Sequence, residues 1–577
     1  MRITNLEVHN FRGIKNGAAS FPNDSRIACI IGAGDSTKST LLKAIEWAFW
    51  PSWNLIVNDT DFYHEDIANP IVIRCTFYEF PNKLMAEDKY GLYLRKPNTE
   101  LVGEVNDEPT DGGPYCLTIQ FTADSSLEPK WEIVCNRLEP KPIPHSDRRT
   151  LSFGVVGEGC SKDMVWGKYS ILQKYADAKG VLHEAYTAAL RDVVDKADFS
   201  KLDDIATTLS DIGKKYGVGF ENSLKSRLLI QNGSFSSTVG LFDGDVPLSQ
   251  MGTGSQRLIS MGLNINISDG DSLLLIDEIE TGLEPYRIRS LINEFRTEYS
   301  TSGQIIMTTH SPVVVAECSI DELLVAHSIS GETKAVLLKS SDADTKDNIQ
   351  KQIRSNSEAF LSKRLIVCEG KTEMGFIRAF DEFLNRTQAY RMAYKGIGTA
   401  DGNGANIFNC ANILAEAGYE ICILMDSDNE NEDNNKSLMR SNGISVFDWK
   451  KPFAFEEQVF SEISIDTINQ ALKIAVGKKS CDSIKRNLSG SSIPFNVSGD
   501  SIVIEKITSE QRIQLGTIAK NNGWFKNIGL GQRLGHLVFS EFDLLDADSG
   551  IKSVVNDLAA WVMKYDTERT VADTETE

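Results

Sequence analysis

Residues 248–312 contain three segments that decide the fold, LSQMGTGSQRL (248–258), DSLLLIDEIETGLEP (271–285) and QIIMTTHSP (304–312). The apolar run before Asp277 and Glu278 predicts a buried parallel strand that ends in two carboxylates. A second apolar run leads to His310, whose imidazole we expect at the same edge of the sheet. Together they predict the Walker B side of an ATPase, where Asp277 is linked to Mg2+ and Glu278 polarises water. The alternative is that these acids and His310 lie at the ends of two ordinary surface strands.

A phosphate-binding loop is predicted near the amino terminus. A strand at 26–31 leads into GAGDSTKST (32–40) and then into a helical pattern, LLKAIEWAF. Backbone N–H groups and a helix amino terminus cradle phosphates, the lysine neutralises them and the following hydroxyl reaches Mg2+. The candidate nucleotide-binding residues here are Gly32, Lys38, Ser39 and Thr40. Thr37 stands where this motif has its second glycine, so backbone strain and weakened nucleotide binding or slow hydrolysis are expected.

The two halves of this ATPase sheet are separated by a long insertion. Residues 71–79, 115–121 and 131–138 are predicted to be antiparallel strands. Residues 169–178 and 183–216 show 3.6-residue apolar spacing, which predicts a helical region over about 165–240. This region either packs on the ATPase or forms a dimerisation arm.

Composition limits the classes of protein. The chain has 577 residues and a net charge of −21, which excludes a surface that is basic throughout but not one basic groove. It has no apolar run long enough to cross a bilayer and no apolar signal region at its start, so no membrane association and a cytoplasmic location are expected.

These motifs, together with NFRGI at 10–14, resemble the ATPase heads of the SMC/RecF branch of the ABC class over residues 1–345. In that class ATP lies between two heads, so the resemblance implies a homodimer or higher homo-oligomer formed through the heads. Ser255 and Gln256 would then face a nucleotide held by Lys38 of a partner subunit. The chain has no long heptad stretch, which excludes a coiled-coil arm.

A second α/β pattern begins after a polar connector at 339–357. A strand at 364–368 ends at Glu369, and a later strand at 421–425 ends at Asp426 and Asp428. Alternate side chains of a strand lie on one face, so the two aspartates are expected to point the same way, with Glu369 beside them. Three convergent carboxylates repel one another unless a divalent cation lies among them, which predicts Mg2+ or Mn2+. Unconnected loop acids are the alternative.

Strand, EGxTE, helix and a later strand with DxD resemble the TOPRIM fold, here over residues 358–565. An ABC head followed by TOPRIM resembles the OLD (overcoming lysogenisation defect) nucleases over essentially the whole chain. The resemblance implies that Glu373 and Glu456 help to hold a second metal ion, with the adjacent Glu457 as an alternative. It also implies that Lys526, in the segment GWFK, neutralises charge in the transition state. Residues 566–577 are expected to be a disordered tail.

The resemblance implies an ATP-regulated, divalent-metal-dependent DNA endonuclease that leaves a 5′-phosphate and a 3′-hydroxyl. Paired metal ions would activate water and stabilise the leaving oxygen. Bacterial anti-phage defence, with a helicase or a retron as partner, is the expected setting. An ATP-gated DNA-binding or recombination factor without cleavage activity is the alternative. A topoisomerase-like enzyme is a weaker one, because the tyrosines lie in no recognisable motif.

Overall fold

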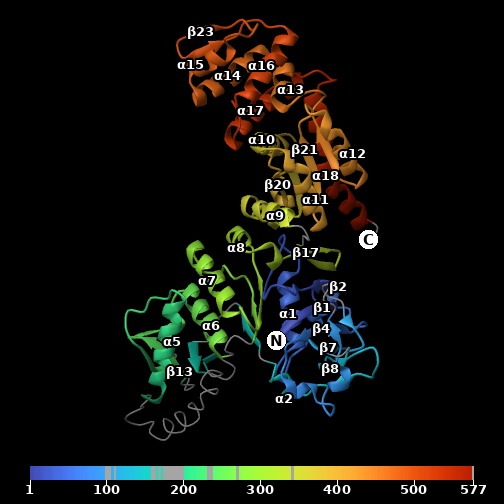
Figure 1. Ribbon diagram of the computed structural model, residues 1–577, viewed down its shortest axis with the longest axis vertical. Helices are drawn as coiled ribbons and strands as arrows, with labels where there is room; N and C mark the ends of the chain where they lie inside the picture. Colours follow the sequence, from blue (N-terminus) through green and yellow to red (C-terminus); the bar gives the residue numbers. More distant parts are fainter. Residues whose placement is uncertain are drawn as a thin grey trace. The chain divides into compact units, whose positions relative to one another are not determined.

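The computed structural model describes residues 1–97, 105–109, 112–151, 153–157, 164–166, 171–172, 200–229, 238–267, 272–338 and 343–574. The chain divides into two compact units, Met1–Leu361 and Ser362–Glu577 (Figure 1). The predicted connector contains a helix, α9 (Ala343–Ser355), that packs against α8 (Pro312–Glu317) of the first unit. The first unit therefore ends sixteen residues after the predicted end at 345, and the second begins four residues after the predicted start at 358.

One mixed sheet organises the described part of the first unit. Its strands, in spatial order, are β10 (Phe153–Val156), β15 (Leu273–Ile276), β16 (Gln304–Thr308), β3 (Ile27–Ile31), β17 (Leu323–Ile329), β18 (Glu332–Leu337), β2 (Ile14–Ser20), β1 (Arg2–Phe11), β4 (Ile71–Tyr78), β7 (Cys116–Ala123), β8 (Lys130–Val134) and β9 (Lys141–Pro142). The strands from β10 to β17 pair parallel with one another, and those from β2 to β9 pair antiparallel with one another. Between the two halves, β18 pairs antiparallel with β17 and parallel with β2.

The parallel half brings the sequence motifs to one edge. Strands β15, β16 and β3 are apolar runs with every residue buried, as expected for strands covered on both faces. Ile276 pairs with Met307, and Met307 pairs with Cys29, so the three strands end at nearly the same level. The Walker B segment and the phosphate loop are therefore two strands apart, with the strand that leads to His310 between them.

The antiparallel half carries the helix that follows the phosphate loop. Helix α1 (Lys38–Ala48) packs against β1, β4 and β7, and Trp47 lies between the rings of Phe11 and Phe121. The predicted strands at 71–79, 115–121 and 131–138 are confirmed as β4, β7 and β8. This apolar packing fixes the first turn of α1, which carries Lys38 and Ser39, against the sheet.

The expected helical insertion at 165–240 is wrong in part. Helix α5 (Asp203–Lys215) lies in this range and packs against α6 (Thr253–Ile267), but β12 (Leu224–Leu229) and β13 (Thr238–Asp243) form an antiparallel pair. Each strand is six residues long and mixes polar with apolar residues, too short a stretch to separate a period of 2 from one of 3.6, which explains the error. Residues 173–199, also expected to be helical, lie outside the described residues.

The second unit contains a parallel sheet in the order β20–β19–β21–β22, formed by β20 (Ile397–Asp401), β19 (Arg364–Cys368), β21 (Glu420–Met425) and β22 (Ser445–Asp448). Helix α10 (Lys371–Gln388) follows β19. The chain continues through α13 (Phe455–Glu462), α14 (Ile465–Lys479), α15 (Cys481–Leu488), α16 (Ser509–Asn521) and α17 (Ile528–Ser540), which gather beyond one end of this sheet in Figure 1.

Two features complete the second unit. Helix α10 packs closely along α17, because a Cβ on Gly375 would lie 2.2 Å from the carbonyl oxygen of Ile528. The last helix, α18, spans Gly550–Thr574, so the backbone is helical over part of the segment for which the sequence predicts disorder. In the part of the chain that the structure describes, no helix is both long and apolar enough to cross a membrane.

Candidate nucleotide site and carboxylate cluster

The phosphate loop closes around its own lysine. Gly32 has φ +138°, and a Cβ there would lie 2.5 Å from the carbonyl oxygen of Ala326, so only glycine fits. Lys38 is buried, and its ammonium donates to the carbonyl oxygens of Gly32 (3.1 Å) and Ala33 (2.7 Å) and to Ser36 Oγ (3.1 Å). Burial lowers the pKa of Lys38 to about 8, against the opposing charges of Asp35 and Asp277. A bound phosphate would replace these carbonyl contacts with a full negative charge.

Asp277 and Ser39 meet at the edge of the sheet, as predicted. Ser39 Oγ donates to Asp277 Oδ1 at 2.9 Å, and Thr308 Oγ1, from the strand between them, donates to the same oxygen at 2.6 Å. A carboxylate and a hydroxyl at this position are ligands of the type that Mg2+ takes beside bound phosphates. Thr40 is half-buried in the next position of α1. Their role with Mg2+ and ATP stays a prediction.

Glu278 and His310 lie at the same edge, and a third acid, Glu280, positions His310. Glu278 has φ 47°, and its N–H donates to Thr308 Oγ1 at 2.8 Å. His310 is exposed. Its N–H and the hydroxyl of Thr309 both donate to Glu280, each at 2.6 Å. Glu280 therefore anchors the segment that follows β16; the sequence signal was the second glutamate in the run DEIE.

The turn at 252–256 begins α6 and packs directly on the loop after Glu278. Ser255 is half-exposed, whereas Gln256 is buried and donates to the carbonyl oxygens of Ser249 (3.0 Å) and Met251 (2.8 Å). Gln256 thus braces its own turn, and its predicted contact with a partner's nucleotide stays untested. Sequence reasoning missed Arg257, which is buried and donates to the carbonyl oxygens of Asp277 (2.6 Å) and Glu278 (2.9 Å).

Thr37 holds the strained conformation that its position requires. Its φ and ψ are 62° and 19°, in the left-handed region, and its hydroxyl contacts Ser36 O (2.7 Å) and Thr333 Oγ1 (3.0 Å). We expect Thr37→Gly to be more stable than Thr37→Ala by about 1 kcal/mol, because both lose the hydroxyl but only alanine keeps a Cβ in this region. Thermal unfolding of the two variants measures the difference. Equal stability would show that the loop does not hold this conformation in solution.

Strands β19 and β21 place the predicted acids of the second unit side by side. The strands are parallel neighbours, with Cys368 opposite Leu424, so Glu369 and Asp426 both follow at the carboxyl end. The N–H of Asp426 donates to Glu369 Oε2 at 2.8 Å, and the N–H of Phe455, at the start of α13, donates to Asp426 Oδ1 at 2.9 Å. Asp426 is 9% exposed. The carboxyl end of this sheet is therefore joined to α13.

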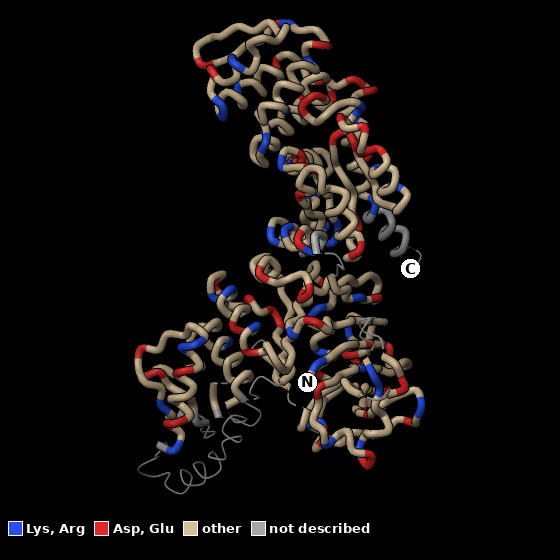
Figure 2. Tube along the Cα trace, in the orientation of Figure 1, with Lys and Arg blue, Asp and Glu red and all other residues tan. Residues whose placement is uncertain are grey.

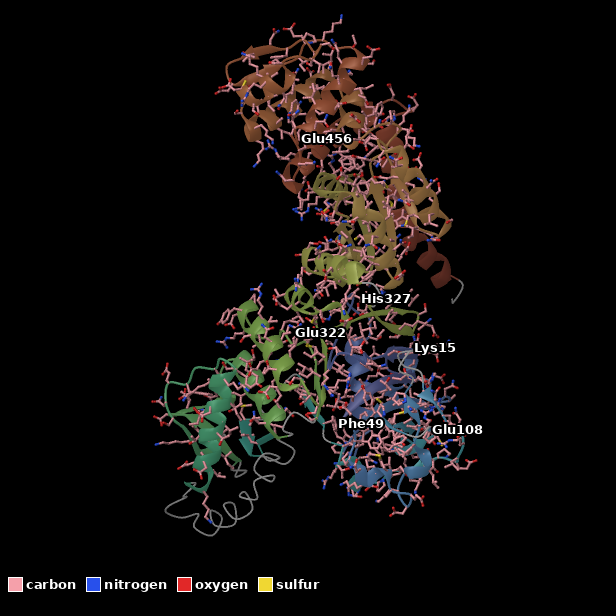
Figure 3. The ribbon with its side chains drawn as sticks, in the orientation of Figure 1. Lys15, Phe49, Glu108, Glu322, His327 and Glu456 are labelled. Atoms are coloured by element: carbon pink, nitrogen blue, oxygen red, sulfur yellow. The ribbon has the colours of Figure 1, made fainter. Side chains whose placement is uncertain are left out.

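Two further acids enter the same cluster from helices. Glu373 lies in the first turn of α10, Glu456 lies in the first turn of α13, and both are buried. Glu456 is labelled in Figure 3. Burial and the negative charges of neighbouring carboxylates raise the pKa values of Glu369, Glu373 and Asp426, and burial raises the pKa of Glu456. Glu456 acts on both Glu373 and Asp426, whereas the alternative Glu457 caps α13 by accepting from the N–H of Ala454 at 2.9 Å. Asp428 lies at the exposed rim of the cluster.

Two lysines lie on this cluster. Lys526 follows the buried Trp524 and Phe525, is exposed, and its charge opposes the rise in the pKa of Glu456. Lys520, which sequence reasoning missed, forms an ion pair with Asp428 and lies 3.9 Å from Asp426. No nearby motif marks Lys520, because its place depends on how α16 packs on α13.

A buried lysine also supports the turn that holds both aspartates. Lys436 is 2% exposed and donates to the carbonyl oxygen of Asp426 (2.7 Å), to Ser427 Oγ (3.0 Å) and to Asp448 Oδ2 (3.1 Å). These bonds fix the backbone between Asp426 and Asp428. Figure 2 colours Asp and Glu positions red, and several of them lie along the trace near α12 (Asp433–Ser441) and α13.

The donor set fits divalent metal ions by its chemistry. Buried carboxylates that repel one another are the ligands that Mg2+ and Mn2+ prefer, and a cation would remove the cause of their raised pKa values. Within the described residues, no three acid, histidine or cysteine side chains are yet arranged closely enough to hold a metal ion. Glu369 and Asp426 each accept a backbone N–H, and Asp428 accepts the ammonium of Lys520 instead.

The raised pKa of Glu373 predicts pH-dependent stability. Burial and the charge of Glu456 raise the pKa of Glu373 from 4.5 to about 8 in the folded state. Between these two pH values the folded state keeps a proton on Glu373 that the unfolded state has released. Stability is then full below about pH 4.5 and falls by on the order of a few kcal/mol as the pH rises to about 8. Thermal unfolding of the metal-free protein against pH measures this slope.

Controls isolate the contribution of Glu373. We expect Glu373→Gln to reduce the slope, and Glu430→Gln, at an exposed acid after β21, to leave it unchanged. Millimolar Mg2+ should flatten the slope of the wild type as well. A wild-type slope that survives in Glu373→Gln would place the responsible proton on another group.

Comparison with known proteins gives two family matches. Residues 173–316 match a family described as an AAA domain, putative AbiEii toxin of a type IV toxin–antitoxin system. Residues 360–428 match the TOPRIM domain of overcoming lysogenization defect protein-like proteins. The second match runs from just before β19 to Asp428.

Individual relatives are more distant. The chain is 26% identical over 200 residues to the Old nuclease of Escherichia phage P2, a match that covers 31% of this chain and 33% of that protein. The chain thus spans a third of the curated relative it matches. A solved structure of an Smc head bound to the C-winged helix domain of ScpA has a TM-score of 0.39 and 18% identity, and the match covers 60% of this chain and 99% of that one. The SMC head domain from Thermotoga maritima has a TM-score of 0.29 and 12% identity, and the match covers 59% of this chain and 100% of that one.

The two family matches follow one another along the chain in the order in which the two units occur. The first lies within the unit of the large mixed sheet, and the second begins at the boundary and ends in the carboxylate cluster. The chain therefore combines an ATPase domain with an OLD-like TOPRIM domain, and this combination matches the ATPase–TOPRIM fusion of the OLD family.

Proposed function

We propose that this protein is an ATP-regulated, divalent-metal-dependent DNA endonuclease. The observation that supports the proposal most is the convergence of four acids from β19, α10, β21 and α13, with Asp428 at their rim. Such a set, buried and mutually repelling, destabilises the fold unless it serves a cation. The similarity to the Old nuclease of phage P2 supports nucleic acid cleavage as the use of that cation.

Glu369, Asp426 and Asp428 would hold one metal ion, and Glu373 and Glu456 would help to hold a second. Bound there, Mg2+ or Mn2+ supplies an activated water and charge stabilisation for in-line displacement at a phosphodiester. Lys526 lies at the exposed side of the cluster and would neutralise charge on the substrate phosphate. Lys436 would keep Asp426 and Asp428 in place through the backbone it binds.

ATP would act through the first unit. Lys38 would bind phosphates, and Ser39 and Asp277 would hold the accompanying Mg2+. Glu278 and His310 would line the same edge, and Ser255 and Gln256 would meet the nucleotide of a second subunit in a homodimer or higher homo-oligomer. Nucleotide binding would hold two heads together and so control access of DNA to the nuclease. Anti-phage defence in the cytoplasm, alone or with a helicase or retron partner, is the setting we propose.

The test is cleavage of supercoiled and linear DNA by the full chain with Mg2+ or Mn2+, with and without ATP. We expect nicking or cutting by the wild type that is lost in Asp428→Ala, and a change in rate with ATP. Cleavage that survives in Asp428→Ala would remove the carboxylate cluster from the reaction. If the wild type binds DNA in an ATP-dependent way but does not cut with any metal, the alternative of a DNA-binding factor would be favoured instead.

A further inference from the structure

Lys520 is held inside the carboxylate cluster by the helix that carries it. It lies in the last turn of α16, and α16 packs tightly on α13, where a Cβ on Gly516 would lie 2.5 Å from Glu457 Cα. The ammonium forms an ion pair with Asp428 and lies 3.9 Å from Asp426, and the side chain is 29% exposed. It is thus the ammonium in ion-pair contact with both aspartates of the β21 turn.

We propose that Lys520 is an internal counterion whose ammonium holds the carboxylate cluster together without metal and is displaced when a divalent cation enters. This proposal rests on the metal centre of the proposed function. It adds to that function a residue that competes with the metal ion and thereby sets the affinity of the centre for that ion.

The electrostatics of the cluster carry this inference. Several acids at one sheet edge repel one another, so a positive charge must lie among them for all to stay ionised. The positive charge of Lys520 opposes the rise in the pKa values of Glu369, Asp426 and Glu456 together. Asp428, a proposed metal ligand, forms an ion pair with this ammonium. A metal ion therefore competes with Lys520 for the same oxygens.

The side chain of Lys520 can move out of the carboxylate cluster. A lysine ammonium is a compact charge on a flexible four-carbon stem, so rotation about its side-chain bonds withdraws it without moving α16. The 29% exposure of Lys520 gives its charge access to solvent on that path. Lys436, which is 2% exposed and bonded to three partners, has no such freedom and keeps its structural position.

The test is Mn2+ binding to the full chain in the absence of DNA. Calorimetry and the electron paramagnetic resonance signal of free Mn2+ measure this binding. The variants are Lys520→Met and the matched control Lys526→Met, which removes an equal charge near Glu456 but outside the ion pair. We expect Lys520→Met to lower the Kd for Mn2+ about five- to tenfold, because the competing ion pair is gone. Lys526→Met should change it less than about twofold.

Thermal unfolding gives a second readout that does not depend on affinity. Without metal, Lys520→Met should unfold at a lower temperature than the wild type, and saturating Mn2+ should remove that difference. If wild-type protein binds Mn2+ but Lys520→Met binds it no more tightly, or both variants change alike, the counterion role is overturned and the metal centre stands. If the wild type binds no Mn2+ at all, the metal centre and the counterion both fail.

Discussion

Replacing Asp426 with asparagine is expected to reduce metal-dependent DNA cleavage by about 10³-fold and, at the same time, to raise the unfolding temperature of the metal-free protein. The loss follows from the place of Asp426, which is 9% exposed at the end of β21 and bonded to Glu369 through its own N–H. An amide oxygen can still accept the N–H of Phe455, so the turn is preserved while one anionic ligand is removed.

The gain in stability follows from the sign of the pKa shift. Burial, then the charges of Glu373 and Glu369, raise the pKa of Asp426 well above its ordinary value. The folded state therefore loses stability as the pH rises above the unfolded-state pKa, and at about pH 8 the wild type bears this cost while the asparagine variant does not. A gain of about 1 kcal/mol would raise the unfolding temperature by about 3 °C. A carboxylate with only a structural role would give the opposite sign.

The matched control is Asp433→Asn, in the first turn of α12. Asp433 is a half-exposed acid whose ion-pair partner Lys451 lowers its pKa, so its removal should leave the cleavage rate, and the pH dependence of unfolding between about pH 5 and 8, close to wild type. DNA cleavage with Mg2+ and thermal unfolding with and without Mg2+ measure the two effects on each variant. An Asp426→Asn protein that is both inactive and less stable would mean that the acid supports the fold rather than the reaction.

Acids that follow a strand directly could be predicted from the sequence. Asp277, Glu369 and Asp426 each come after an apolar run, and parallel strands bring such residues to one sheet edge whatever the rest of the chain does. The phosphate loop was predictable for the same reason, including the strain at Thr37, because strand, loop and helix are adjacent in sequence.

Residues that act through tertiary packing could not be found in this way. Lys520 and Lys436 reach the aspartates from α16 and α12, and Arg257 reaches the Walker B turn from α6. A lysine or arginine on an amphipathic helix carries no local signal that distinguishes a buried partner from solvent. The strands β12 and β13 were missed for a related reason, because their pairing with each other overrides the short-range apolar period.

Replacing Gly254 with alanine is expected to have the largest effect on the ATPase unit. A Cβ on Gly254 would lie 2.0 Å from the carbonyl oxygen of Gly282, and Gly282 itself has φ +75°. Both contacting groups are backbone, so no side chain can rotate to relieve the overlap, and α6 must shift away from the loop that follows Glu278. Overpacking of this kind costs about 3 kcal/mol.

The shift would also reach the nucleotide site. Arg257 lies one turn along α6 from Gly254 and holds the carbonyl oxygens of Asp277 and Glu278, so moving the helix displaces the residues proposed to serve Mg2+ and water. We therefore expect Gly254→Ala to lose ATP-dependent behaviour as well as thermal stability, measured by unfolding of the full chain with and without Mg2+ and ATP.

The same turn supplies the control. A Cβ on Gly252 would meet no atom within 4 Å, so Gly252→Ala should match the wild type in unfolding temperature. The two substitutions add the same methyl group two residues apart, and only the contact with Gly282 distinguishes them. If both variants unfold like the wild type, α6 and the loop after Glu278 are not packed as closely in solution as the Gly254–Gly282 contact requires. If both are damaged equally, the effect belongs to backbone freedom in the turn rather than to that contact.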